Sequence, residues 1–94
     1  MNSLPPHLTP DLYPAFITRQ IGREVRVRRE LLGLSAYALA KLARVTDQTI
    51  LNIEQGATCP NFVTVALICV RFGTTATEFV GSAEQRPDCP KSLG

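Results

Sequence analysis

The fold is decided by residues 34–60, which read LSAYALAKLARVTDQTILNIEQGATCP. Ser35 and Thr46 are good helix N-caps, because their hydroxyl oxygens can accept a hydrogen bond from a free backbone N–H group of the first turn. Gly56 suits the left-handed position that ends a helix. The pattern predicts two short helices, one beginning at Ser35 and one at Thr46, joined by the brief link Arg44–Val45.

Each of these helices has an apolar side that a core could cover. We expect four residues to point inward, namely Leu39 and Leu42 from the first helix and Ile50 and Ile53 from the second. The opposite side of the second helix is polar. In a helix-turn-helix, one helix lies in a groove while the other braces it, and this pair has that architecture. The geometry alone also permits an ordinary helical bundle.

Further helices are predicted on both sides of the pair. Pro14 suits the first turn of a helix that Gly33 ends. Its apolar face consists of Ile17, Ile21, Val25 and Leu32. Another helix opens at Pro60–Asn61 and stops at Gly73, and apolar residues cover more than half of its circumference. They are Phe62, Val65, Ala66, Ile68, Cys69 and Phe72.

Residues 75–78, TATE, have the spacing of a capping box and predict a last short helix docked by Phe79 and Val80. No stretch carries a strand signal. The expected fold is therefore all-α and compact, with five helices and the helix-turn-helix at the second and third of them. We expect the domain to span residues 14–80, between an irregular lead-in at residues 1–13 and a flexible C-terminal tail at residues 81–94.

Composition narrows the function classes. The 94 residues suffice for one domain, and the net charge of +2 is too small by itself to indicate a polyanionic partner. Cys59, Cys69 and Cys89 are spaced unlike a metal knuckle or a redox pair, so no metal is expected and the thiols should be free in a reducing compartment. Neither a secretory signal nor a membrane span is evident, which favours the cytoplasm.

The sequence also resembles a known protein family. Residues 34–60 are similar to the helix-turn-helix of the lambda-repressor-like, XRE or Cro-type transcriptional regulators. The matching positions are Gly33-Leu34-Ser35, Leu39-Ala40, Val45-Thr46, Thr49-Ile50, Ile53-Glu54, Gly56 and Pro60, with Ile21-Gly22 and Arg29 upstream. Their order and spacing together carry the resemblance. It implies a regulator that binds double-stranded DNA with the helix beginning near Thr46.

Members of this family often pair an Arg near the end of the first helix with a Glu near the end of the third. Arg29 and Glu54 occupy those positions. A guanidinium that meets a carboxylate with two hydrogen bonds would fix the orientation of the recognition helix more than it would add stability. The alternative is that the two are unrelated surface charges.

The recognition helix supplies the candidates for contact with bases. If Thr46 caps it, its early turns present four residues away from the core: Gln48, Asn52, Thr49 and Asp47. Amide side chains match the N6 and N7 edge of adenine. Asp47 could accept from a cytosine amino group, but an acidic residue is also favourable at any helix start, and we favour that interpretation. Leu51 could contact a thymine methyl group or a protein partner.

Contacts with phosphates are expected at the starts of the two helices. The candidates are Ser35, Thr46, Lys41, Arg44 and Arg28. The family's frequent Gln is Ala36 here, and Ala57–Thr58 lacks the usual cation, so one subunit should bind weakly. A homodimer on an inverted repeat would compensate. Its contacts could be Phe79 and Val80, or the lead-in with Leu8, Leu12 and Tyr13, and both sets could instead close the core.

Other functions find less support. The single histidine, His7, lies in the lead-in, and no nucleophile with a positioned base emerges, so an enzyme is not expected. No cofactor and no small-molecule ligand is indicated. The main alternative is a protein-interaction module or antitoxin-type partner that uses the same fold with weak or no DNA binding.

Overall fold

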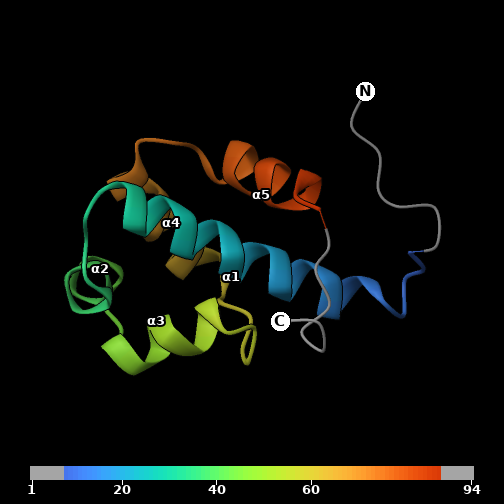
Figure 1. Ribbon diagram of the computed structural model, residues 1–94, viewed down its shortest axis with the longest axis horizontal. Helices are drawn as coiled ribbons and strands as arrows, with labels where there is room; N and C mark the ends of the chain where they lie inside the picture. Colours follow the sequence, from blue (N-terminus) through green and yellow to red (C-terminus); the bar gives the residue numbers. More distant parts are fainter. Residues whose placement is uncertain (1–7, 88–94) are drawn as a thin grey trace.

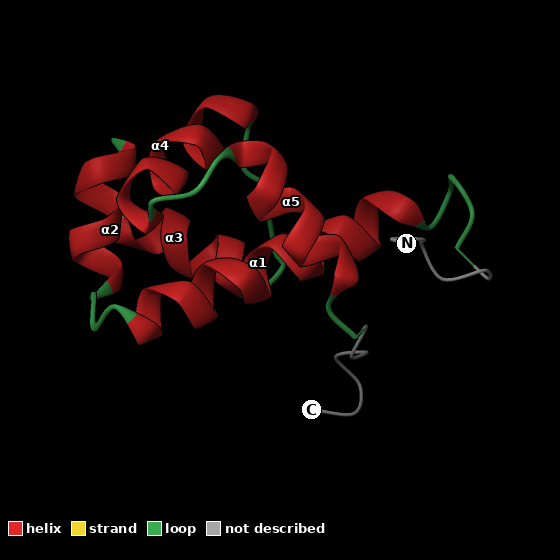
Figure 2. Ribbon diagram, turned by 90° about the horizontal axis from the view of Figure 1, so that it is seen from above, coloured by secondary structure: helices red, strands yellow, loops and turns green. Residues whose placement is uncertain are grey.

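The computed structural model describes residues 8–87 and shows an all-α fold. Its helices are α1 (Tyr13–Leu31), α2 (Ala36–Ala43), α3 (Asp47–Glu54), α4 (Phe62–Phe72) and α5 (Ala76–Gln85). Short loops join them, and the described residues contain no strand (Figure 2). α1 lies between α5 and α3, with α5 above it and α3 below it in Figure 1. The five-helix, all-α fold expected from the sequence is confirmed.

Side-chain caps set the starts of the shorter helices. Ser35 Oγ accepts a hydrogen bond from the backbone N–H of Ala38 at 3.0 Å, and Thr46 Oγ1 accepts one from the N–H of Thr49 at 3.1 Å. Thr75 forms the expected capping box at the start of α5. These caps satisfy N–H groups that the helices themselves leave free, so each start is fixed by its local sequence.

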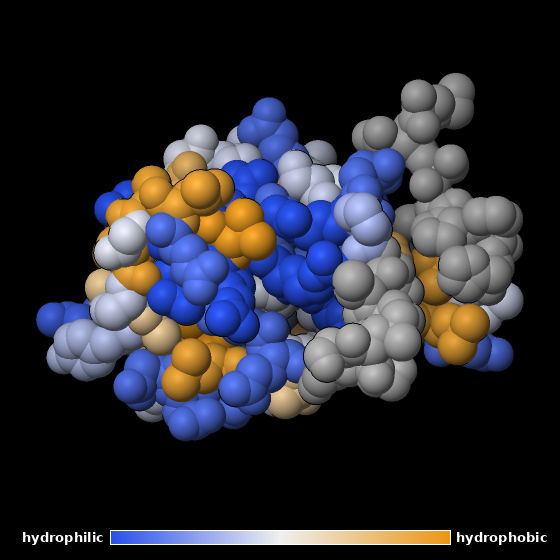
Figure 3. All heavy atoms as spheres, in the orientation of Figure 1, coloured by the Kyte–Doolittle hydropathy of each residue, from blue (hydrophilic) through white to orange (hydrophobic). Residues whose placement is uncertain are grey.

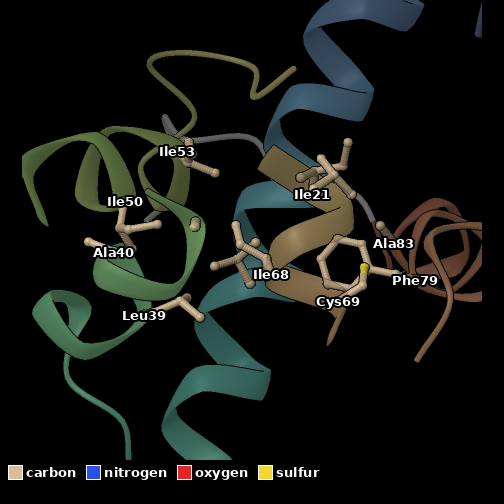
Figure 4. Packing of buried hydrophobic residues seen from close by; sticks show 12 residues of the cluster. Ile21, Leu39, Ala40, Ile50, Ile53, Ile68, Cys69, Phe79 and Ala83 are labelled. Atoms are coloured by element: carbon tan, nitrogen blue, oxygen red, sulfur yellow. The ribbon is translucent and has the colours of Figure 1, made fainter. Parts of the chain in front are cut away.

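The core lies where the helices meet. Ile68 of α4 lies at its centre, with Leu39 and Ile50 on one side and Phe79 and Ala83 on the other (Figure 4). All of these side chains are fully buried. Their burial supplies the main driving force for folding, because it removes apolar surface from water. The inward direction expected for Leu39 and Ile50 is therefore correct.

Three residues expected in the core are exposed instead. Leu32, Leu42 and Phe62 keep 45%, 47% and 73% of their surface accessible. Leu32 follows the last residue of α1, and Phe62 is the first residue of α4, so neither lies within the buried face of its helix. In α2 the buried residues are Leu39, Ala40 and Ala43, and this places Leu42 on the outer side.

The last helix is longer than predicted. α5 continues past Val80 to Gln85, so the expected tail at residues 81–94 begins too early. Ala83 is fully buried, and the side chain of Gln20 on α1 donates from Nε2 to the carbonyl of Ala83 at 3.0 Å. These contacts order a segment whose small, polar composition resembles a tail. The rest of the proposed tail, residues 88–94, and residues 1–7 of the lead-in lie outside the described residues.

A buried carboxylate ties the end of α5 to α1. Glu24 Oε2 lies 2.6 Å from Nε of Arg28, and Glu24 Oε1 lies 2.5 Å from Nε of Arg86. The carboxylate therefore meets a cation on each side, and this compensates for its removal from water. We call Glu24, Arg28 and Arg86 the C-terminal clasp.

α4 and α5 meet at a sharp bend of 93°. Gly73 ends α4 in the left-handed conformation, with φ 72°, which glycine adopts without strain. Among the described residues, no single helix is long and apolar enough to cross a membrane. Only α4 and α5, counted together, have the required length and hydropathy.

Candidate nucleic-acid interface

The turn between α2 and α3 is tight and rigid. Arg44 ends α2 in the left-handed conformation, with φ 60° and ψ 41°, and Val45 N–H donates to the carbonyl of Ala40 at 3.0 Å. Thr46 then caps α3. This backbone conformation at Arg44 could not be predicted from the sequence, because glycine and asparagine are the residues that normally mark it. The turn sets the angle at which α3 leaves α2.

α3 is held from behind by the core and by α1. Ile50 and Ile53 are fully buried, as expected. A Cβ atom on Gly22 of α1 would lie only 2.2 Å from the carbonyl oxygen of Ile53 and 3.1 Å from that of Glu54. The backbones of α1 and α3 therefore touch at Gly22, and no larger residue fits there.

A bidentate ion pair fixes the same end of α3. Arg29 Nε lies 2.6 Å from Glu54 Oε2, and Arg29 Nη2 lies 3.0 Å from Glu54 Oε1. The hydrogen bonds to Glu54 raise the pKa of Arg29 above its ordinary value. These are the two residues that the sequence suggested as a pair, and their geometry joins the end of α1 to the end of α3.

The side of α3 that faces away from the core is polar. Asp47 and Gln48 are exposed, and Asn52 is half-buried. Gln48 Nε2 donates a hydrogen bond to Asn52 Oδ1 at 3.0 Å, so the two amides form a pair one helical turn apart. Asp47 Oδ1 accepts from the backbone N–H of Gln48 at 2.9 Å, as befits a residue at a helix start. Figure 3 shows hydrophilic residues around a small apolar patch at the lower edge of the view, where α3 lies.

Comparison with known proteins identifies this geometry. The family described as "Helix-turn-helix domain" matches residues 20–79. The chain belongs to the helix-turn-helix domain family. Its helix-turn-helix consists of α2, the turn at residues 44–46, and α3, as the sequence predicted.

Solved structures share the fold of this helix-turn-helix protein. A crystal structure of the clp gene regulator ClgR from Corynebacterium glutamicum has a TM-score of 0.67 at 21% identity, covering 71% of this chain and 71% of that one. A second structure of ClgR has a TM-score of 0.65 at 21% identity, covering 71% of this chain and 87% of that one. Comparison with the curated proteins gave no match.

Four of the predicted phosphate-contacting residues flank the helix-turn-helix. Ser35 and Thr46 are exposed caps at the starts of α2 and α3. Lys41 and Arg44 are exposed at the end of α2, and Nζ of Lys41 lies 5.3 Å from the centre of the Tyr37 ring. Arg44 and the cap Thr46 thus lie in the turn directly before α3, and Lys41 lies in the last turn of α2.

The fifth predicted residue, Arg28, makes its contacts away from the helix-turn-helix. Its Nε contacts Glu24 in the C-terminal clasp, and its guanidinium lies 5.3 Å from the centre of the Phe79 ring of α5. Arg28 therefore faces α5, on the other side of α1 from α3 (Figure 1). These contacts place Arg28 away from the other four predicted residues, and the sequence alone did not show which face of α1 meets α5.

The residues suggested for a dimer interface differ in their exposure to solvent. Phe79 is fully buried and stacks on Phe72 with ring centres 6.1 Å apart, so it belongs to the core and not to an interface. Val80 is half-buried. In the lead-in, Leu12 is exposed, and the Tyr13 hydroxyl donates to Glu84 Oε2 at 2.5 Å. Burial and Glu84 raise the pKa of Tyr13 to about 12.

The cysteines show no arrangement for metal chemistry within residues 8–87, where no cluster of His, Cys, Asp or Glu could hold an ion. Cys59 is a free, exposed thiol in the loop before α4, and Cys69 is a free, buried one. Burial raises the pKa of the Cys69 thiol. His7 and Cys89 lie outside the described residues.

Proposed function

We propose that this chain is a transcriptional regulator that binds double-stranded DNA sequence-specifically, with α3 in the major groove. Repression is the simplest consequence of covering an operator, and the cytoplasm is where such a protein would act. The observation that carries the proposal is the amide pair of Gln48, which is exposed, and Asn52, which is half-buried, on the outer side of a helix whose other side is held by the core. B-DNA's major groove, about 12 Å wide, admits such a helix.

The amide pair can read bases. After Gln48 donates one N–H to Asn52, it keeps one N–H and its carbonyl oxygen, the set that matches adenine N7 and N6. Asn52 keeps both N–H groups, which match acceptors such as guanine O6 or thymine O4. Asp47 has one oxygen left for a cytosine amino group, and Leu51 is placed for a thymine methyl group. Thr49 is the fourth candidate, although its hydroxyl lies 2.9 Å from that of Thr46.

The operator should be an inverted repeat bound by a homodimer. Lys41 and Arg44, with the caps Ser35 and Thr46, give one subunit few contacts to phosphates, and nonspecific affinity rises with the number of phosphates neutralised. Two subunits would double these contacts and read half-sites about 34 Å apart.

Selection of binding sites from random duplex DNA tests the proposal. The wild type should enrich a short inverted repeat, and Gln48→Ala should relax the preference at one base pair of each half-site, at a loss of about 1–3 kcal/mol. Gln85→Ala, the same change at an exposed position of α5, is the matched control and should select the wild-type sequence. Failure of the wild type to enrich any sequence at low salt would overturn the proposal.

One observation favours the interaction module as a second candidate. Phe62, Val63 and Val70 give α4 an exposed apolar side, and such surfaces often mark contacts with proteins. Salt separates the two functions, because DNA binding weakens steeply as salt rises, whereas an apolar contact does not.

A further inference from the structure

The two ends of α3 differ in the basic residues near them. Arg44 lies in the turn before its amino end and Lys41 lies in the last turn of α2, whereas the last turn of α3 contains no basic residue. Glu54 at that end is paired with Arg29. The loop that follows, QGAT at residues 55–58, contains no cation of its own.

Arg19 of α1 reaches this loop. A Cβ atom built on Gly56 would lie 3.7 Å from Cγ of Arg19 and 3.8 Å from its Cα, which is ordinary van der Waals contact. The stem of Arg19 therefore lies across Gly56, the residue just past the end of α3. The loop beneath is held in place, because Gly56 N–H donates to the carbonyl of Ile53 at 3.0 Å and Ala57 N–H donates to that of Asn52 at 2.9 Å.

The spacing along α1 explains this position. Arg19, Gly22 and Arg29 lie three and seven residues apart, and this places them along one side of a helix. Gly22 touches the backbone of α3, and Arg29 binds Glu54, so that side faces α3. Arg19 is its member nearest to the loop after α3.

We propose that Arg19 is a further phosphate-contacting residue, which binds the DNA backbone at the carboxyl end of α3. The inference rests on the proposed function. α3 has eight residues and is thus about 12 Å long, comparable with the width of the major groove, so backbone phosphates lie near both of its ends. Lys41 and Arg44 serve one end, and Arg19 serves the other.

Arg19→Gln tests this proposal, because it keeps most of the stem and removes the charge. Affinity is measured between 0.05 and 0.3 M salt, about the range in which phosphate contacts dominate, on the selected operator and on a random duplex of equal length. Loss of one phosphate contact should reduce the slope of log K against log salt by about 0.9 and weaken binding about eightfold at 0.1 M salt. The loss should be equal on both duplexes, since phosphates carry no sequence information.

Two further variants make the outcome unambiguous. Arg19→Lys keeps the charge and should keep the wild-type slope. Arg71→Gln removes an exposed cation in the last turn of α4, a helix outside the helix-turn-helix, and should leave binding unchanged. An unaltered slope in Arg19→Gln, or an equal loss in Arg19→Lys, would overturn the assignment. If the wild type binds no duplex at low salt, the proposed function itself fails.

Discussion

Arg29 joins three segments by binding Glu54 through two nitrogens, at 2.6 and 3.0 Å, while its Nη1 donates to the carbonyl of Leu34 at 2.8 Å. The side chains of Arg29 and Glu54 are only 14% and 4% exposed. Removing two charges from water costs much of the free energy that their attraction returns. The pair should therefore matter most for the orientation of α3.

Removing one partner should be more harmful than removing both. Glu54→Leu leaves the Arg29 charge buried without its carboxylate and should destabilise the fold by about 3 kcal/mol, whereas Arg29→Met combined with Glu54→Leu should recover most of that loss. Urea unfolding measures both variants. DNA affinity should stay low in the double variant, because α3 loses its tie to α1. A single variant as stable as the wild type would contradict this account.

Gly22→Ala should displace α3. The new Cβ would meet the carbonyl oxygen of Ile53 at 2.2 Å, and backbone atoms cannot move aside as a flexible side chain can. A loss of roughly 1–3 kcal/mol is expected from such overpacking. Gly81→Ala in α5 is the matched control, since its Cβ meets nothing within 4 Å, and it should be neutral or stabilise the helix by up to about 1 kcal/mol. Thermal unfolding compares the two, and equal melting temperatures would refute the close contact.

The C-terminal clasp should determine whether α5 keeps its last turn. Arg86→Met leaves Glu24 with Arg28 as its remaining ion-pair partner, at an expected loss of about 1–3 kcal/mol, since one buried charge-assisted hydrogen bond disappears. Hydrogen exchange should accelerate at residues 83–86 and stay slow at the start of α5, which its capping box holds. Gln85→Ala serves as the control. Unchanged protection in Arg86→Met would show that the clasp does not hold this turn.

Alkaline pH should weaken the contact between α1 and α5. The pKa of Tyr13 is about 12 in the folded protein, against an ordinary value near 10, so the folded state favours the protonated phenol. Stability from this group is present in full below about pH 10 and is lost as pH rises towards 12. The stability difference between the wild type and Tyr13→Phe should therefore shrink over that window. Tyr37→Phe, the same change at an exposed position of α2, is the matched control.

The starts of the helices could be predicted because their signals are local. Ser35, Thr46 and Thr75 each cap a backbone N–H group three residues away. The pairing of Arg29 with Glu54 followed from the family resemblance, since nothing local links residues so far apart in the sequence.

Apart from Leu32 and Phe62, which lie at helix ends, the differences from the predictions concern contacts between distant segments. Leu42 was expected inside because it is apolar, but the side of α2 that packs against α3 and α4 consists of Leu39, Ala40 and Ala43. For Phe79 the sequence left both an interface and the core open, and the fold buries it in the core. Arg28 was expected near phosphates, but its contacts with Glu24 and the Phe79 ring lie where α1 meets α5. The end of α5 was missed because Gln20 and Glu24, which hold it, lie on a helix far away in the sequence.

At Arg44, the backbone conformation favours glycine, whereas the proposed contact with phosphate requires a cation. The left-handed backbone of this residue, which a glycine would adopt freely, costs a side-chain-bearing residue about 1–2 kcal/mol, yet a glycine there would lack the cation that we propose for contact with phosphate. A search for heat-resistant variants would thus be expected to recover Arg44→Gly. The variants with the highest thermal stability from such a search would then have a lower affinity for the operator under the proposed function.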